Sequence, residues 1–190
     1  MYGCILAIQE LSSSLYATFS CTSMGESMSV STEHGSSEDG SIEREIHIAA
    51  PPEIVFTVIS SPEHLVRWWA EAAEFIPAAG ESGHLTFGDP SDGGERVSIT
   101  VVEVDAPRRF AFRWVYDPER SATPSNSLLV TFELDPHGDQ STVLRMTETG
   151  FRQKDWSTAA QQEQHRENVL GWESMLPRLR DYVAAEVSAA

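Results

Sequence analysis

The last part of the chain, from Thr158 to Val187, constrains the fold most strongly because it predicts one long amphipathic helix. Its apolar residues recur at steps of three or four, which places their side chains on one stripe of a helix. At 1.5 Å per residue this helix would be about 45 Å long, so it needs a broad apolar surface to lie on. The stripe consists of Val169, Trp172, Leu176, Leu179, Val183 and Val187, widened by Leu170, Met175 and Tyr182.

Pro177 lies inside this predicted helix. Proline has no backbone N–H, and its ring clashes with the carbonyl group four residues earlier, so we expect a kink near Glu173 to Leu176. The simplest interpretation of the stripe itself is a core helix that packs without a ligand.

The length and the charge of the chain limit its organisation and its partners. A chain of 190 residues is expected to form one domain with a tail. The formal net charge of -16 disfavours phosphate backbones and anionic lipids, so we expect no nucleic-acid binding. No apolar run approaches the length that spans a bilayer, so we expect no membrane insertion.

Residues 1–40 are predicted to form a disordered leader. Ser, Glu, Gly and Met dominate from Ser23 to Ser41 and leave little apolar surface to bury. One hypothesis is that the start is wrongly assigned and that translation begins at Met24 or Met28. The competing hypothesis is an amphipathic tail that docks on the domain.

The folded domain is predicted to span residues 41–187, with a short tail at residues 188–190. The two cysteines, Cys4 and Cys21, both precede it. We therefore expect neither a disulfide framework nor a cysteine metal site in the domain, which fits a cytoplasmic location.

Shorter periodic patterns between residues 41 and 150 predict the remaining elements. Apolar and polar residues alternate as in strands, and Pro52 and Pro62 are well placed in the first turns of two short helices. The expected order is one strand, two short helices, about six antiparallel strands and the long helix, an α+β arrangement. The predicted strands are Ile42–Ile48, Ala73–Ile76, His84–Phe87, Arg96–Val104, Arg109–Tyr116, Leu128–Leu134 and Thr142–Thr149, and the short helices are Glu53–Ile59 and Glu63–Trp69.

Short motifs follow one another through these elements, namely Ala49–Phe56, Ser61–Leu65 running into Trp68 and Trp69, Val101–Phe110, Phe112–Trp114, Thr147–Phe151 and Gly171–Trp172. Together they resemble the START-like superfamily, also called SRPBCC or birch-pollen-allergen-like. Within it, the chain is most similar to the group named for the activator of the 90-kDa heat-shock protein ATPase. The resemblance covers about residues 41 to 187.

The resemblance implies a helix-grip fold, in which a curved antiparallel sheet wraps around the long C-terminal helix and leaves an apolar cavity between them. Relatives use this cavity for lipids, polyketides or hormones, some as cyclases and others only as binders. A eukaryotic relative uses the domain as a co-chaperone, together with an additional N-terminal domain that has no counterpart here.

A search for catalytic and metal-binding motifs finds none with the required spacing. The six histidines are scattered and lack the His-Glu-x-x-His pattern, there is no Gly-x-Ser-x-Gly elbow, and no cofactor motif occurs. We therefore predict no catalytic residue, no metal site and no cofactor.

Two charged residues are predicted to point inward. If Leu144 and Met146 face the core, strand alternation turns Glu148 inward, and the same alternation turns Arg44 inward from the first strand. The family fold makes the first and last strands neighbours, so we expect Arg44 and Glu148 to pair. One interpretation is a partly hydrated structural pair at the open end of the sheet. The other is a polar anchor for a ligand at the mouth of the cavity.

The residues expected to line the cavity are mostly aromatic, with two methionines and one carboxylate. A pocket of this kind suits a flat or apolar small molecule. The predicted ligand-binding residues are Trp69, Phe87, Phe112, Trp114, Met146, Glu148, Trp172, Met175 and Leu176.

Three functional hypotheses follow. The first is a cytoplasmic protein that binds a small apolar or aromatic ligand without chemistry. The second is a protein-interaction or stress-related, co-chaperone-like module, whose acidic outer face meets a basic partner or which forms a homodimer. The third is an enzyme of the cyclase or aromatase kind, with Glu148 or His84 as general acid or base.

Overall fold

The computed structural model describes residues 40–89, 94–153 and 157–189. Except for Gly40, the predicted leader lies outside these ranges, together with Met24, Met28 and both cysteines. The elements in chain order are β1 (Ile42–Ile48), α1 (Pro52–Ser60), α2 (Pro62–Trp68), β2 (Ala72–Glu74), β3 (Ser82–Phe87), β4 (Glu95–Asp105), β5 (Arg109–Val115), β6 (Leu128–Pro136), β7 (Thr142–Thr149), the 3₁₀ turn η3 (Phe151–Gln153) and α3 (Thr158–Ala189).

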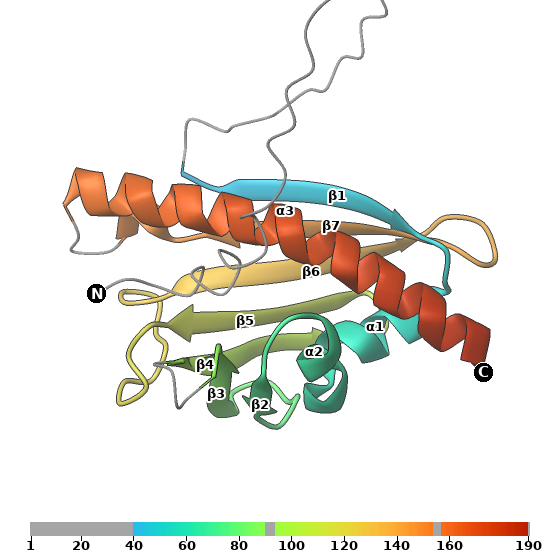
Figure 1. Ribbon diagram of the computed structural model, residues 1–190, viewed down its shortest axis with the longest axis horizontal. Helices are drawn as coiled ribbons and strands as arrows, with labels where there is room; N and C mark the ends of the chain where they lie inside the picture. The colour runs from blue at the N-terminus through green and yellow to red at the C-terminus, as the bar shows by residue number, and fades with distance from the viewer. Residues whose placement is uncertain (1–39, 90–93, 154–156, 190) are drawn as a thin grey trace, which may run out of the picture.

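The strands form one seven-stranded antiparallel sheet in the order β1-β7-β6-β5-β4-β3-β2. Strand β1 pairs with β7 rather than with β2, because the two short helices carry the chain away from β1 before the meander begins (Figure 1). The predicted α+β helix-grip fold is therefore confirmed, including the neighbouring first and last strands. Strands β1 and β7 also begin and end at the predicted residues.

Helix α3 lies across one face of this sheet (Figure 1). Its stripe buries Trp172, Leu176, Leu179 and Val183, each at most 3 % exposed. The helix is 32 residues long and is continuous through Pro177. Pro177 has no N–H to donate to the carbonyl group of Glu173, four residues earlier. Both Glu173 and Pro177 are exposed, so this carbonyl group lies on the side of the helix that water can reach.

Figure 1 shows that α3 changes direction along its length. The helix is not interrupted near Glu173 to Leu176, where the kink is predicted.

Within the described ranges, no helix is both long and apolar enough to cross a membrane.

The two short helices cover the same side of the sheet next to α3. Pro52 and Pro62 occupy their first turns, as predicted, because a proline there removes an N–H that has no helical partner anyway. Helix α1 buries Val55, Phe56, Val58 and Ile59 in the common core, and α2 buries Leu65 and Trp68.

The other face of the sheet carries charged side chains, and neighbouring strands place opposite charges next to each other. Arg145 of β7 contacts Glu45 of β1 at 2.9 Å, and Arg109 of β5 contacts Glu133 of β6 at 3.3 Å. We call this the outer face. The apolar side chains of β3 to β7 therefore gather between the sheet and the helices, where the candidate site lies.

Candidate functional site

Trp69 lies at the centre of a group of aromatic rings between the sheet and α3. It directly follows α2, and it is partly exposed while its neighbours are buried. The ring centroid of Trp69 lies 5.3 Å from Trp172, 5.6 Å from Phe87, 5.7 Å from Phe112 and 6.0 Å from Trp114. It also stacks on Trp68, with the centroids 5.7 Å apart and the planes 15° from parallel. We call these six residues the aromatic group.

The alternation of the strands explains how distant segments supply this group. In β5, Phe110, Phe112 and Trp114 face the helices, while Arg109, Ala111 and Arg113 face outward. Phe87 at the end of β3 faces the same side as Leu85. Helix α3 contributes Trp172 from the middle of its apolar stripe.

Glu148 lies beside the aromatic group and is 0 % exposed. One carboxylate oxygen accepts hydrogen bonds from Trp114 Nε1 at 2.8 Å and from Asn168 Nδ2 at 3.1 Å. The other oxygen accepts a hydrogen bond from Trp172 Nε1 at 2.8 Å. A buried charge is tolerated only when polar groups surround it, and a carboxylate is suited to receiving several N–H donors at once. Glu148 thereby fixes the orientation of two indole rings.

A chain of polar side chains continues from Glu148 toward the surface. Asn168 Oδ1 accepts hydrogen bonds from Gln164 Nε2 at 2.7 Å and from the Tyr116 hydroxyl at 3.4 Å. Gln164 Nε2 also lies 2.9 Å from the Tyr116 hydroxyl oxygen. Asn168 was not among the predicted site residues. A signal was present, because Gln164, Asn168 and Trp172 are spaced four apart and share one face of the helix.

The expected pairing of Arg44 with Glu148 is wrong. Arg44 does face the helix side of the sheet, but its guanidinium lies 3.0 Å from Glu173 of α3. The register places Glu148 opposite Ile42 and Arg44 opposite Met146. Arg44 therefore lies two residues further along β1, where α3 supplies a closer carboxylate. The expectation that Glu148 is partly hydrated at the open end of the sheet also fails, because Glu148 is fully buried.

The remaining predicted residues lie in the same apolar core. Met146 is 0 % exposed and Leu176 is 3 % exposed, and Met175 is partly buried and packs against the core. The structure thus brings the predicted ligand-binding residues into one cluster, which the side chains fill by packing against one another.

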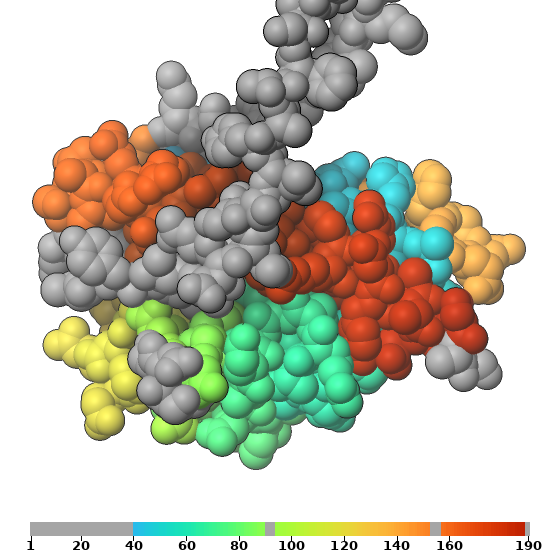
Figure 2. Space-filling model, viewed as in Figure 1, coloured from blue at the N-terminus to red at the C-terminus, as the bar shows by residue number. Residues whose placement is uncertain are grey.

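A hydrogen bond also joins α2 to α3. His64 Nδ1 lies 2.8 Å from the Tyr182 hydroxyl. Burial, followed by a hydrogen bond to Glu186, raises the pKa of Tyr182. Figure 2 shows the teal surface of the short helices meeting the red C-terminal half of α3.

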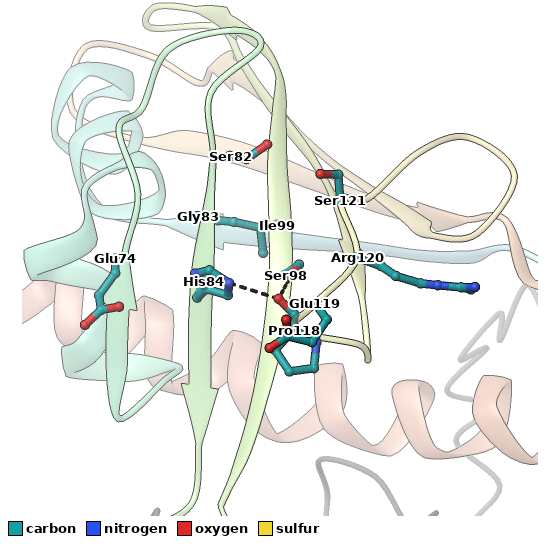
Figure 3. Close-up of a pocket in the computed structure, with 10 residues that line it drawn as sticks. All are labelled: Glu74, Ser82, Gly83, His84, Ser98, Ile99, Pro118, Glu119, Arg120 and Ser121. Atoms are coloured by element: carbon teal, nitrogen blue, oxygen red, sulfur yellow. Dashed lines mark hydrogen bonds between the residues drawn. The ribbon is translucent and has the colours of Figure 1, made fainter.

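His84 lies apart from the aromatic group, in a polar pocket on the outer face (Figure 3). Because Leu85 and Phe87 face the core, alternation turns His84 outward, so His84 and Glu148 lie on opposite sides of the sheet. His84 Nε2 and Ser98 Oγ both lie within 3.3 Å of the Pro118 carbonyl oxygen.

The pocket has a volume of about 360 Å³ and is lined by Glu74, Ser82, Gly83, His84, Ser98, Ile99, Pro118, Glu119, Arg120 and Ser121. Figure 3 shows Arg120 extending away from His84. The loop after β5 thus packs against β3 and β4 through its own backbone carbonyl. In the part of the chain that the structure describes, no group of three His, Cys, Asp or Glu side chains could hold a metal ion.

Solved structures show the same fold. The chain matches protein MLL2253 from Mesorhizobium loti with a TM-score of 0.60 and 20 % identity, over 76 % of this chain and 97 % of that one. CalU16 from Micromonospora echinospora matches with a TM-score of 0.55 and 21 % identity, over 78 % and 79 %. The Aha1 dimer from Colwellia psychrerythraea matches with a TM-score of 0.54 and 17 % identity, over 75 % and 95 %.

A comparison with curated proteins finds no match. The family model described as Activator of Hsp90 ATPase homolog 1-like protein matches residues 49–184. This range extends from the segment before α1 to the last turns of α3, so it includes both short helices, strands β2 to β7 and the aromatic group. The chain therefore belongs to the Activator of Hsp90 ATPase homolog 1-like family, with its START-like fold.

Proposed function

We propose that this protein binds a small, flat apolar or aromatic molecule between the sheet and α3, at the place that the Trp69 ring occupies. The observation that carries the proposal is the position of Trp69. It is partly exposed, it directly follows a helix of seven residues, and its ring lies among rings that come from β3, β5 and α3.

The aromatic group has the properties of a binding site once Trp69 swings out. The rings of Phe87, Phe112, Trp114 and Trp172 are each at most 9 % exposed and would remain as walls. Offset and edge-to-face contacts between rings add to the free energy of simple burial. A flat ligand could therefore replace the contacts that Trp69 makes, while Glu148 keeps two of the walls in place.

The proposed site is formed by residues of the predicted ligand-binding set. The expected cytoplasmic location rests on the sequence alone. For the cyclase or aromatase hypothesis, Glu148 and His84 are the two candidate groups, and they lie on opposite sides of the sheet, so they cannot act on one substrate together.

Binding can be tested with the full chain and 9-fluorenone, a rigid aromatic probe, by quenching of tryptophan fluorescence. The wild-type protein should bind the probe, and Trp69→Ala should bind it about tenfold more tightly, because an apolar space the size of an indole ring is then open. Val102→Ala is the control, since Val102 is 42 % exposed and lies outside the core cluster. If neither the wild type nor Trp69→Ala bound the probe, the proposed function would be wrong.

Self-association is a second candidate property. It is supported by the similar structure from Colwellia psychrerythraea, which is described as a dimer. Sedimentation equilibrium at about 100 μM should then show a dimer. A single species with the mass of one chain would remove this candidate.

A further inference from the structure

The indole of Trp68 differs from those of Trp114 and Trp172, the two indoles that donate to Glu148. Trp68 is 3 % exposed, and its Nε1–H has no hydrogen-bond partner among the residues that the structure describes. Trp114 and Trp172 each donate to Glu148 at 2.8 Å. Buried indole N–H groups normally find an acceptor, and leaving one without it carries a free-energy penalty.

This unpaired donor belongs to the aromatic group. Trp68 stacks on Trp69, the ring that we propose a ligand replaces. The two centroids are 5.7 Å apart although the planes are nearly parallel, so the rings are displaced sideways as well as stacked. A ligand in the place of Trp69 would therefore lie beside Trp68, and the N–H group lies in the plane of the Trp68 ring.

We infer that the ligand carries a hydrogen-bond acceptor oxygen, such as a carbonyl group, on its flat apolar body, and that Trp68 Nε1–H is the donor that recognises this oxygen. The inference rests on the proposed function and narrows its ligand class from aromatic compounds in general to oxygenated ones. Glu148 is not suited to this part, because both of its carboxyl oxygens already accept hydrogen bonds, from Trp114, Asn168 and Trp172. The recognised oxygen thus pairs with a donor that the folded protein leaves unused.

The inference predicts a difference between two probes of nearly equal shape. Fluorene and 9-fluorenone differ by one methylene group that becomes a carbonyl group. Their affinities should be compared on the full-length wild type and on Trp68→Phe, which keeps an aromatic ring and removes the N–H. The preference for fluorenone over fluorene should be about tenfold greater in the wild type than in Trp68→Phe.

The stability of two matched variants tests, without any ligand, whether the Trp68 N–H is an unused donor. Trp68→Phe removes an N–H that makes no hydrogen bond, whereas Trp172→Phe removes a donor from buried Glu148. Trp172→Phe should therefore lower the melting temperature clearly more than Trp68→Phe. An equal loss in both variants would contradict the assignment of Trp68 as an unused donor.

NMR of the indole N–H signals keeps the test independent of how well the variants fold. On wild-type protein, 9-fluorenone should move the Trp68 Nε1–H signal downfield, as a new hydrogen bond does, and fluorene should not. If both probes bind without this shift and the preference is the same in Trp68→Phe, the inference is wrong and the proposed binding stands. If neither probe binds to the wild type or to Trp69→Ala, the proposed function itself fails.

Discussion

At the scale of single residues, Glu148 is the side chain on which the arrangement of the core depends most. It is fully buried and receives N–H donors from β5 and from two successive turns of α3. The sheet and the helix are thereby joined by directional bonds as well as by apolar packing. Such a group costs free energy to bury, but it allows only one relative orientation of the two tryptophan rings that it binds.

Glu148→Gln should lower the free energy of unfolding by about 1–3 kcal/mol. Glutamine keeps the shape of the side chain, but its amide N–H₂ would replace one accepting oxygen and face a donor that then lacks an acceptor. Urea denaturation followed by tryptophan fluorescence measures the loss. Glu133→Gln makes the same chemical change on the outer face, where Glu133 is 47 % exposed and pairs with Arg109, and should change stability by less than about 0.5 kcal/mol. Equal effects of the two variants would contradict the role given to Glu148.

The pKa values of Glu167 and Glu163 are shifted in opposite directions, so we expect the two residues to affect stability in opposite ways as the pH changes. Burial, and then the charge of Glu163, raises the pKa of Glu167. The folded state therefore disfavours the charged form of Glu167. This destabilisation is absent below the pKa of an unfolded glutamate, about 4.3, and develops as the pH rises through the folded pKa. Glu167→Gln should thus raise the melting temperature at pH 7, and the gain should vanish near pH 3.

Glu163 provides the matched control on the same helix. Its hydrogen bond with Arg166 lowers the pKa of Glu163, so the stability it contributes is present above the unfolded pKa and is lost as the pH falls. Glu163→Gln should therefore lower the melting temperature slightly at pH 7, because the pair is exposed. Shifts of the same sign in both variants would contradict this assignment.

At the scale of elements, the short helix α2 connects the binding proposal to the long helix. It ends at Trp68 and is followed directly by Trp69, and His64 within it bonds to Tyr182 of α3 at 2.8 Å. Either His64 Nδ1 or the Tyr182 hydroxyl can donate in this bond, depending on the tautomer of the imidazole. Movement of α2 that opens the place of Trp69 would strain or break this link.

A double-mutant cycle with His64→Ala and Tyr182→Phe should give a coupling free energy of about 0.5–1.5 kcal/mol. Each single variant removes one partner, and the double variant should cost less than the sum of the two. Thermal or urea unfolding provides the four free energies. Strict additivity would show that the two side chains lie close without contributing a shared interaction.

At the scale of the whole molecule, the net charge of -16 acts against the compact state. The outer face counters this locally, because Arg145 lies against Glu45 and Arg109 against Glu133. These pairs are exposed, so each contributes little and salt weakens each one. The carboxylates without a basic partner repel one another over the whole surface, and salt screens this repulsion as well as the attraction within the pairs.

Adding salt should therefore stabilise the protein at pH 7. Between about 20 mM and about 300 mM NaCl, the melting temperature should rise, because screening removes more repulsion than attraction in a chain with 29 acidic and 13 basic residues. Differential scanning calorimetry measures the change, and the same series near the pI of about 4.6 is the control, where the effect should be small. A melting temperature that falls with salt at pH 7 would show that the ion pairs outweigh the net charge.

Local periodicity alone determined the identity and the order of the elements. The stripe from Val169 to Val187 and the alternation in Ile42–Ile48 predicted α3 and β1 because side-chain direction repeats every 3.6 residues in a helix and every two in a strand. Which residues face the core follows from the same rule, so the predicted lining residues do meet in one cluster. The family resemblance added the order of the strands.

Tertiary structure decided which side chains meet as partners. The strand alternation places Arg44 and Glu148 on the same side of the sheet. The register of β1 on β7 and the docking of α3 then decide their partners: Arg44 contacts Glu173, and Glu148 accepts hydrogen bonds from two indoles. The same docking left Trp68 without an acceptor in the described chain. Periodicity specifies a direction within one element, whereas a hydrogen bond requires two elements to be positioned within fractions of an ångström, and only the packed core sets that position.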